Sequence, residues 1–189
     1  MLSFPVKYRP EFEGPFLPPA IEYTNVIDQD LANELISLAT NHDGWHRRGS
    51  KSKFIEASFS TTLLHDLNHP IYSILDNYWQ KATDEYGLML DFVEVYEVKE
   101  YKCGDMFGPH IDSHEKIDVI LDRKLNCILQ LSDATAYEGG DLYIKDYTAS
   151  KNLGSLIFFP ANYQHQVTKV TSGTRYSLIG HGWGNVYRR

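Results

Sequence analysis

The part of the chain after residue 91 constrains the fold most, because short strand-like runs replace helical periodicity there. Each run is rich in apolar, β-branched or aromatic residues, and turn residues separate one run from the next. The runs are "DFVEVYEVKEY" (91–101), "NCILQLS" (126–132), "DLYIKDY" (141–147), "GSLIFF" (154–159), "HQVTKVT" (165–171) and "TRYSLIG" (174–180). Successive short strands of this kind predict an antiparallel sandwich or barrel.

The N-terminal half predicts helices that support this β body. Asp28 is placed to cap a helix whose apolar residues recur at helical spacing. A second helix should begin at Pro70, which suits a first-turn position, and should end at Gly87. Between them, 41–53 ("NHDGWHRRGSKSK") is expected to be a loop, and 21–27 ("IEYTNVI") is expected to be a short strand. The predicted class is α+β, mainly β.

The proline content marks a boundary near residue 20. Five of the eight prolines fall among the first 19 residues, which predicts an extended N-terminal arm over 1–20. The remaining 21–189 are expected to form one domain with its core at 91–184, since 189 residues suit a single domain.

Composition narrows the functional classes. A net charge of −7 argues against a nonspecific grip on nucleic acid. Two cysteines without paired spacing fit a reducing compartment. The N-terminus lacks the apolar core of a signal peptide, and no apolar run reaches membrane-spanning length. These features predict a soluble, cytoplasmic protein without membrane partners.

The segment "GPHIDSHEK" (108–116) raises the question of a metal site. His110 and Asp112 would share one face of a strand, because side chains alternate with period two. His165 is the best candidate for a third ligand, and two histidines with one carboxylate form the set of non-haem Fe(II) oxygenases. An exposed polar pair is the alternative interpretation of His110 and Asp112. His114 is expected not to be a ligand, because a fourth would occupy a position needed by reactants.

An arginine supports the metal-site interpretation. A two-residue loop at Ser172–Gly173 would put His165 and Arg175 on opposite faces. If Thr171–Gly173 formed a three-residue hairpin loop, His165, Arg175 and Ser177 would lie on one face, with Gly173 in the left-handed position. An arginine near a metal is suited to bind a carboxylate with two parallel hydrogen bonds.

Three stretches together resemble a known family: "YKCGDMFGPHID", "LQLSDATAYEGGDLYI" and "IFFPANYQHQVTKVTSGTRYSL". In order and spacing they resemble the Fe(II)/2-oxoglutarate dioxygenases, and among these the prolyl-4-hydroxylase group with its small bacterial and phage-encoded relatives. The resemblance covers roughly residues 91–184. It implies a double-stranded β-helix, a jelly-roll barrel with helices outside.

The resemblance also implies roles for individual residues. The resemblance implies that His110, Asp112 and His165 are the iron ligands and the catalytic residues. The residues implied to bind 2-oxoglutarate are Arg175, Ser177, Tyr101 and, less directly, Gln130, which lies where relatives often carry a tyrosine. The sequence departs from the family at His181, where relatives commonly have a tryptophan. Glu97 and Lys99, on the face of Tyr101, either line the cavity mouth or form a surface pair. For His42, His46, His65 and His69 surface roles suffice.

The implied reaction is hydroxylation of a C–H bond with O₂, releasing succinate and CO₂, with Fe(II), 2-oxoglutarate and ascorbate as a possible reductant. A peptidyl proline is the first candidate substrate. Another protein side chain, a free amino acid or a nucleic acid base stay open, as does a non-catalytic jelly-roll binding module. A cupin-type isomerase would need a His-x-His motif and a nearby glutamate, which we do not find.

Overall fold

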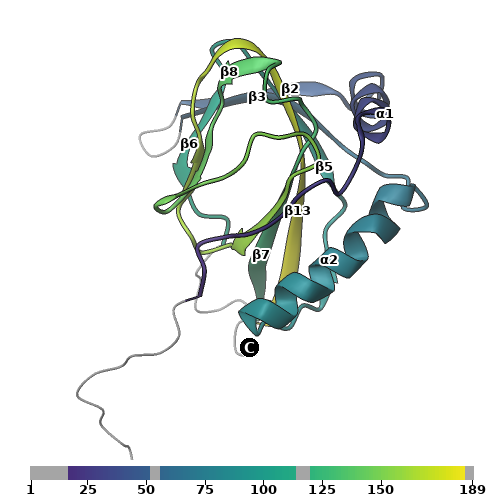
Figure 1. The fold of residues 1–189 in the computed structure, drawn as a ribbon, viewed down its shortest axis with the longest axis vertical. Helices are drawn as coiled ribbons and strands as arrows, with labels where there is room; N and C mark the ends of the chain where they lie inside the picture. Colours follow the sequence, from purple (N-terminus) through teal and green to yellow (C-terminus); the bar gives the residue numbers. More distant parts are fainter. Residues whose placement is uncertain (1–16, 52–55, 114–119, 186–189) are drawn as a thin grey trace, which may run out of the picture.

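The structure is a computed structural model that describes residues 17–51, 56–113 and 120–185. Two helices flank thirteen strands that form one curled antiparallel sheet (Figure 1). The helices are α1 (Gln29–Thr40) and α2 (Pro70–Tyr86). The strands are β1 (Ile21–Tyr23), β2 (His46–Lys51), β3 (Glu56–Leu63), β4 (Phe92–Val93), β5 (Glu97–Lys102), β6 (Met106–His110), β7 (Leu121–Gln130), β8 (Tyr137–Gly139), β9 (Leu142–Ile144), β10 (Tyr147–Thr148), β11 (Leu156–Pro160), β12 (His165–Val167) and β13 (Val170–Asn185).

The predicted fold class, a jelly-roll barrel with supporting helices, is confirmed. Neighbouring strands follow the order β1-β11-β7-β13-β5-β3-β6-β12-β9-β10, and β2, β4 and β8 pair at the side. The sheet curls until β6, β12 and β9 lie across the barrel from β7 and β13, while both helices lie outside (Figure 1). Among the described residues, no helix is both long and apolar enough to cross a membrane.

Both predicted helix starts are confirmed by their caps. The Asp28 carboxylate accepts a hydrogen bond from the backbone N–H of Leu31, as an N-cap should. Pro70 opens α2, and Gly87 ends it with a left-handed φ of 62°. The apolar stripe of α2 packs against the outer face of the sheet, where Trp79 donates to the hydroxyl of Tyr96.

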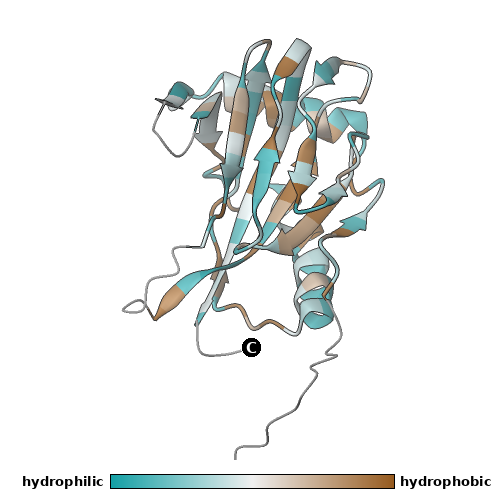
Figure 2. Cartoon of the chain, turned by 90° about the vertical axis from the view of Figure 1, so that its left-hand side faces the viewer, coloured by the Kyte–Doolittle hydropathy of each residue, from teal (hydrophilic) through white to brown (hydrophobic). Residues whose placement is uncertain are grey.

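Alternation along the strands divides the core in two. On β7, Cys127 and Leu129 face the helices, whereas Asn126, Ile128 and Gln130 face the barrel interior. Figure 2 shows the corresponding alternation of apolar and polar residues along several strands. The apolar residues on the outer face of the sheet pack against the helices. The inner face carries polar side chains as well as apolar ones.

Several predictions about local structure are wrong. The run predicted as a single strand over 141–147 instead forms β9 and β10, which pair antiparallel. The segment predicted as a loop over 41–53 contains β2, an edge strand that pairs with β3 and has exposed side chains on both faces, so it has no apolar alternation. Asp112 lies just beyond the end of β6 instead of on the strand with His110. The predicted strand over 165–171 ends at Val167, and the predicted hairpin does not form.

The hairpin prediction fails because other segments take its hydrogen bonds. β12 pairs with β6 and β9, while β13 begins at Val170 and pairs first with β8. Gly173 does adopt a left-handed φ of 73°, but a Cβ there would lie 2.0 Å from the carbonyl oxygen of Ala136. The glycine thus permits a close crossing of β13 over the chain at β8. The predicted N-terminal arm lies outside the described residues up to residue 16.

A buried carboxylate joins the edge of the sheet to its interior. Asp105 accepts hydrogen bonds from Arg47 on β2, from the hydroxyl of Ser58 on β3 and from the backbone N–H of Lys102. Burial by itself raises the pKa of Asp105, but these three hydrogen bonds outweigh burial and lower the pKa below its ordinary value.

Candidate active site

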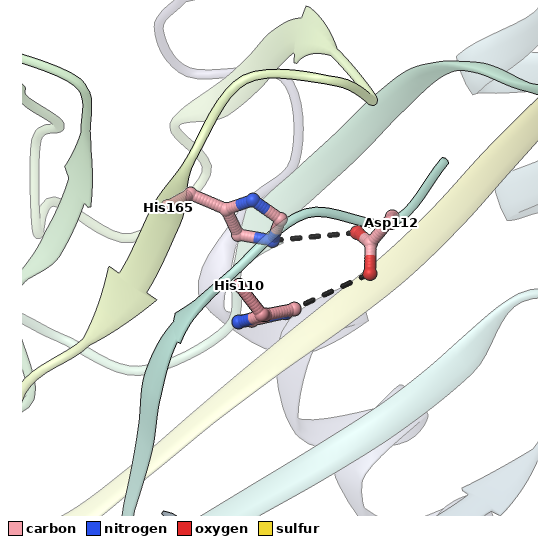
Figure 3. Close-up of side chains that lie close together, drawn as sticks. All are labelled: His110, Asp112 and His165. Carbon is pink, nitrogen blue, oxygen red and sulfur yellow. Dashed lines mark ion pairs between the residues drawn. The ribbon is translucent and has the colours of Figure 1, made fainter. Parts of the chain in front are cut away.

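The side chains of His110, Asp112 and His165 lie close together and point toward one another (Figure 3). His110 ends β6 and His165 begins β12, and the two residues are direct partners in the β6–β12 ladder. Asp112 is held by its backbone N–H, which donates to the carbonyl of Ala161. One potential ligand atom from each of the three residues lies within 4.8 Å of the other two. The candidate metal ligands are therefore brought together, although the predicted strand geometry is wrong.

Backbone carbonyls orient both imidazoles. Nδ1 of His110 lies 2.8 Å from the carbonyl oxygen of Gly108, and Nδ1 of His165 lies 3.0 Å from that of Tyr163. A carbonyl only accepts, so each Nδ1 must donate; in the neutral form of either ring, Nε2 then carries the free lone pair. These Nε2 atoms lie 3.6 Å and 3.3 Å from the carboxylate oxygens of Asp112. Both rings thus present their lone pairs in the way that metal-binding histidines do.

The charges of the site favour the forms that bind metals. Burial lowers the pKa of His110 to about 4, and the neighbouring His165 also lowers it. Burial alone raises the pKa of Asp112, but His165, His181 and His110 outweigh burial and hold that pKa well below its usual range. At neutral pH the cluster therefore has a carboxylate and a neutral His110. Two nitrogens and one oxygen fit Fe(II) with open coordination positions.

Arg175 lies in the same cavity and is buried, with 1% of its surface exposed. Its Nη2 donates to Oε1 of Gln130 at 3.0 Å, and its Nη1 lies 3.4 Å from Oγ of Ser177. The guanidinium also lies 5.3 Å from the centre of the Tyr101 ring. All four residues predicted to bind 2-oxoglutarate are therefore in one place.

The ladder register explains this grouping. On β13, Ser177 is paired with Gln130 of β7 on one side and with Lys99 of β5 on the other, and Arg175 is paired with Tyr101. Directly paired residues on one sheet face have adjacent Cβ atoms. The face that carries Arg175 is thus the inner face of three neighbouring strands.

Sequence reasoning missed Tyr137, which lies beside Arg175. A Cβ built on Gly140 would lie 3.2 Å both from Cδ of Arg175 and from the Tyr137 ring, so the two side chains meet over this glycine. Among the described residues, neither the Tyr137 hydroxyl nor Nε of Arg175 has a hydrogen-bond partner, although both atoms are buried. The "EGG" motif at 138–140 was the signal, because Gly140 leaves the space in which the two side chains meet.

Lys99 lines the cavity, so the question left open for Glu97 and Lys99 is answered. Nζ of Lys99 lies 3.3 Å from a carboxylate oxygen of Glu97 and 4.8 Å from the centre of the Phe59 ring. Burial lowers the pKa of Lys99, but the neighbouring Glu97 carboxylate, with Tyr101 and Asp112, outweighs burial and raises it. The lysine is therefore a buried cation.

His181 and Asn126 extend the cluster on the Asp112 side. The two residues are paired across β7 and β13. Nδ2 of Asn126 donates to Oδ2 of Asp112 at 2.8 Å, and Oδ1 of Asn126 lies 2.9 Å from Nδ1 of His181. Burial lowers the pKa of His181 to about 3, which keeps the ring neutral. Sequence reasoning noted His181 as a departure from the family but missed Asn126.

A cleft of about 370 Å³ opens beside His181. Three histidines expected to have surface roles, His42, His46 and His65, are indeed exposed, and they line this cleft. His69 is buried and caps α2, where its Nδ1 accepts from the N–H of Ile71. His114 lies outside the described residues, so its exclusion as a ligand stays a prediction.

The sequence of this chain is similar to those of known oxygenases and hydroxylases. A family model described as the 2OG-Fe(II) oxygenase superfamily matches residues 96–183. A PKHD-type hydroxylase from Shewanella oneidensis is 42% identical over 85 residues, which cover 42% of this chain and 38% of the relative. A PKHD-type hydroxylase from Idiomarina loihiensis is 29% identical over 111 residues, 57% of this chain and 50% of that protein. The chain thus spans half or less of the length of these curated relatives.

Two solved structures share the fold. The viral collagen prolyl hydroxylase of Paramecium Bursaria Chlorella virus-1 aligns with a TM-score of 0.69 at 15% identity, covering 88% of this chain and 97% of its own. A prolyl-4-hydroxylase from Pseudomonas putida aligns with a TM-score of 0.67 at 17% identity, covering 90% and 93%.

Proposed function

We propose that this chain is an Fe(II)- and 2-oxoglutarate-dependent dioxygenase that hydroxylates a C–H bond; in support, residues 96–183 match the family model of the 2OG-Fe(II) oxygenase superfamily. The observation that carries the proposal is the shared cavity of the three candidate ligands and the buried Arg175. A cation flanked by buried polar atoms without partners suits a carboxylate, and the His/Asp/His cluster suits a metal.

In this proposal His110, Asp112 and His165 hold the iron. When bound, iron supplies the activation of O₂ for oxidation of the substrate while 2-oxoglutarate is converted to succinate and CO₂. The backbone carbonyls of Gly108 and Tyr163 keep both histidines in the binding tautomer.

Arg175 binds the distal carboxylate of 2-oxoglutarate in this proposal. Gln130 and Ser177 fix the plane of the guanidinium, so that its Nε–H remains for the ligand. The Tyr137 hydroxyl, which is also buried without a partner among the described residues, adds a second donor to the carboxylate. The Tyr101 ring, near the guanidinium, completes the wall of the cavity.

The proposed primary substrate is a prolyl residue of a peptide. The support is resemblance: several structures with this fold are prolyl hydroxylases by name. A different protein side chain, a free amino acid and a nucleic acid base are outcomes of the test. Ascorbate is proposed only as a reductant that keeps iron in the Fe(II) state.

The test is incubation with Fe(II), 2-oxoglutarate, ascorbate and proline-containing peptides, with free amino acids and single-stranded oligonucleotides as parallel substrates. Succinate formation and the gain of one oxygen by mass spectrometry are the readouts. Asp112→Ala is the matched inactive control. Wild-type protein that binds neither Mn(II) nor 2-oxoglutarate would refute the proposal and favour a non-catalytic binding module.

A further inference from the structure

His181 lies where two hollows of the molecule meet. It lines the cavity that contains His110, Asp112 and His165, and it also lines the cleft of about 370 Å³. A cleft of this volume is within the range of ligand-binding pockets. The His181 side chain therefore lies between the candidate metal site and this cleft.

Asn126 determines which nitrogen of His181 carries hydrogen. The Asp112 carboxylate only accepts hydrogen bonds, so the Asn126 atom 2.8 Å from it must be the amide nitrogen. The amide oxygen of Asn126 then faces Nδ1 of His181 at 2.9 Å, and that nitrogen must donate. In the neutral ring, Nε2 is left as an acceptor that points away from Asn126.

Most charged groups nearby already have partners. Glu97 accepts from the hydroxyl of Thr61 at 2.6 Å and pairs with Lys99 at 3.3 Å. Glu94 accepts from Arg123 at 2.9 Å. Among the described residues, Nε of Arg123 is a buried donor without a partner.

Because the Arg123 Nε is buried, the group that the cleft offers to a peptide is the acceptor on His181. Each peptide group other than that of proline presents one N–H donor, which complements this acceptor. A prolyl residue has no N–H of its own, so in a prolyl substrate the donor must come from a neighbouring residue.

We infer that His181 is a specificity-determining residue whose Nε2 accepts a hydrogen bond from a backbone N–H next to the oxidised residue of a peptide substrate. This inference rests on the proposed function and names a contact that selects its substrate. Leaving the acceptor without a donor in the complex would reduce kcat/KM at least roughly tenfold.

The first test reads the tautomer of His181 without any turnover. Histidine labelled with ¹⁵N in the Zn(II)-loaded, diamagnetic protein should show a protonated Nδ1 and an unprotonated Nε2 for His181, assigned by loss of its signals in His181→Gln. A proton on Nε2 would overturn the inference.

The second test uses a library of peptides with one central proline. Matched copies carry one N-methyl group. It is placed on the amide nitrogen of the residue before the proline, of the residue after the proline, or of a remote residue. Wild-type protein should lose at least tenfold in kcat/KM for one flanking methylation and nothing for the remote one. His181→Phe should oxidise the methylated and unmethylated copies equally well, and His181→Gln, which retains an acceptor, should recover part of the preference.

Binding separates this inference from the proposed function. 2-Oxoglutarate affinity by calorimetry, measured at saturating Mn(II), should be equal in wild type, His181→Phe and His181→Gln. An unchanged preference in His181→Phe would overturn the inference. If wild type consumes 2-oxoglutarate but oxidises no peptide, the peptide contact is wrong and the oxygenase proposal stands. If wild type binds neither Mn(II) nor 2-oxoglutarate, the proposed function itself fails.

Discussion

Replacing Arg175 by lysine tests whether a planar, buried guanidinium binds 2-oxoglutarate. Its Nη2 bond to Gln130 (3.0 Å) and its Nη1 contact with Ser177 (3.4 Å) hold the plane, leaving one edge with the unpartnered Nε for the carboxylate. Lysine keeps the charge but cannot form two parallel bonds. Loss of one charge-assisted hydrogen bond costs about 1.5–3 kcal/mol, which corresponds to a rise in KM of roughly 10- to 150-fold.

Two further variants separate the contribution of Arg175 to the KM for 2-oxoglutarate from that of Gln130. Arg175→Ala should raise KM further than lysine does, because the carboxylate then has no cationic partner and Oε1 of Gln130 loses its donor. Gln130→Ala should raise KM only about fivefold, or ~1 kcal/mol, because Gln130 acts by orienting the arginine. In the Arg175→Ala background the Gln130 change should have almost no additional effect.

The assay is succinate formation against 2-oxoglutarate concentration at saturating Fe(II), with Mn(II) affinity measured in parallel. Mn(II) affinity should be unchanged in every variant, since Arg175 is not among the candidate ligands. An unchanged KM in Arg175→Ala would refute the co-substrate role. Full additivity of Gln130→Ala and Arg175→Ala would refute the orienting role of Gln130.

Three other predictions test the metal site and the fold. Asp112→Ala should lose Mn(II) binding by calorimetry, because two histidines alone are a weak site, whereas the control His114→Ala should retain it; wild-type affinity in Asp112→Ala would contradict the ligand assignment. Asp105→Asn should reduce the free energy of urea unfolding by ~2 kcal/mol at neutral pH. Because the pKa of Asp105 is lowered in the folded state, this difference is fully present above the ordinary value of 3.8 and should shrink as pH falls through the lower, folded-state pKa; a constant difference would contradict it. Gly139→Ala should destabilise by more than ~2 kcal/mol, since its φ is 66° and a Cβ would lie 2.1 Å from a carbonyl oxygen, while Gly49→Ala, whose nearest atom is 3.7 Å away, should cost little; equal unfolding midpoints would contradict the clash.

Local physics explains what could be predicted from the sequence. Helix caps act through neighbouring residues, so Asp28, Pro70 and Gly87 marked the helix ends correctly. Strand runs with apolar residues were recognisable because one or both faces are buried. The edge strand β2 was missed because both of its faces are exposed, and such a strand has no alternating pattern.

The residues of the candidate site could be predicted from the sequence, but the strand pairing that brings them together could not. The grouping of His110, Asp112, His165 and Arg175 was anticipated from spacing and resemblance, yet the hairpin used to join His165 to Arg175 does not exist. Arg175 reaches the cavity because β13 pairs with both β5 and β7, a register that depends on contacts far apart in the chain.

The sequence by itself determined the chemistry that this protein carries: the donor atoms, the buried cation and the alternation that turns one face of each strand inward. Only the tertiary structure decided which of these side chains meet. The Asp112–Asn126–His181 chain and the contact of Tyr137 with Arg175 across Gly140 join segments that no local pattern connects. The physical reason is that a hydrogen-bond partner is set by strand register, whereas sequence periodicity specifies only the face on which a side chain lies.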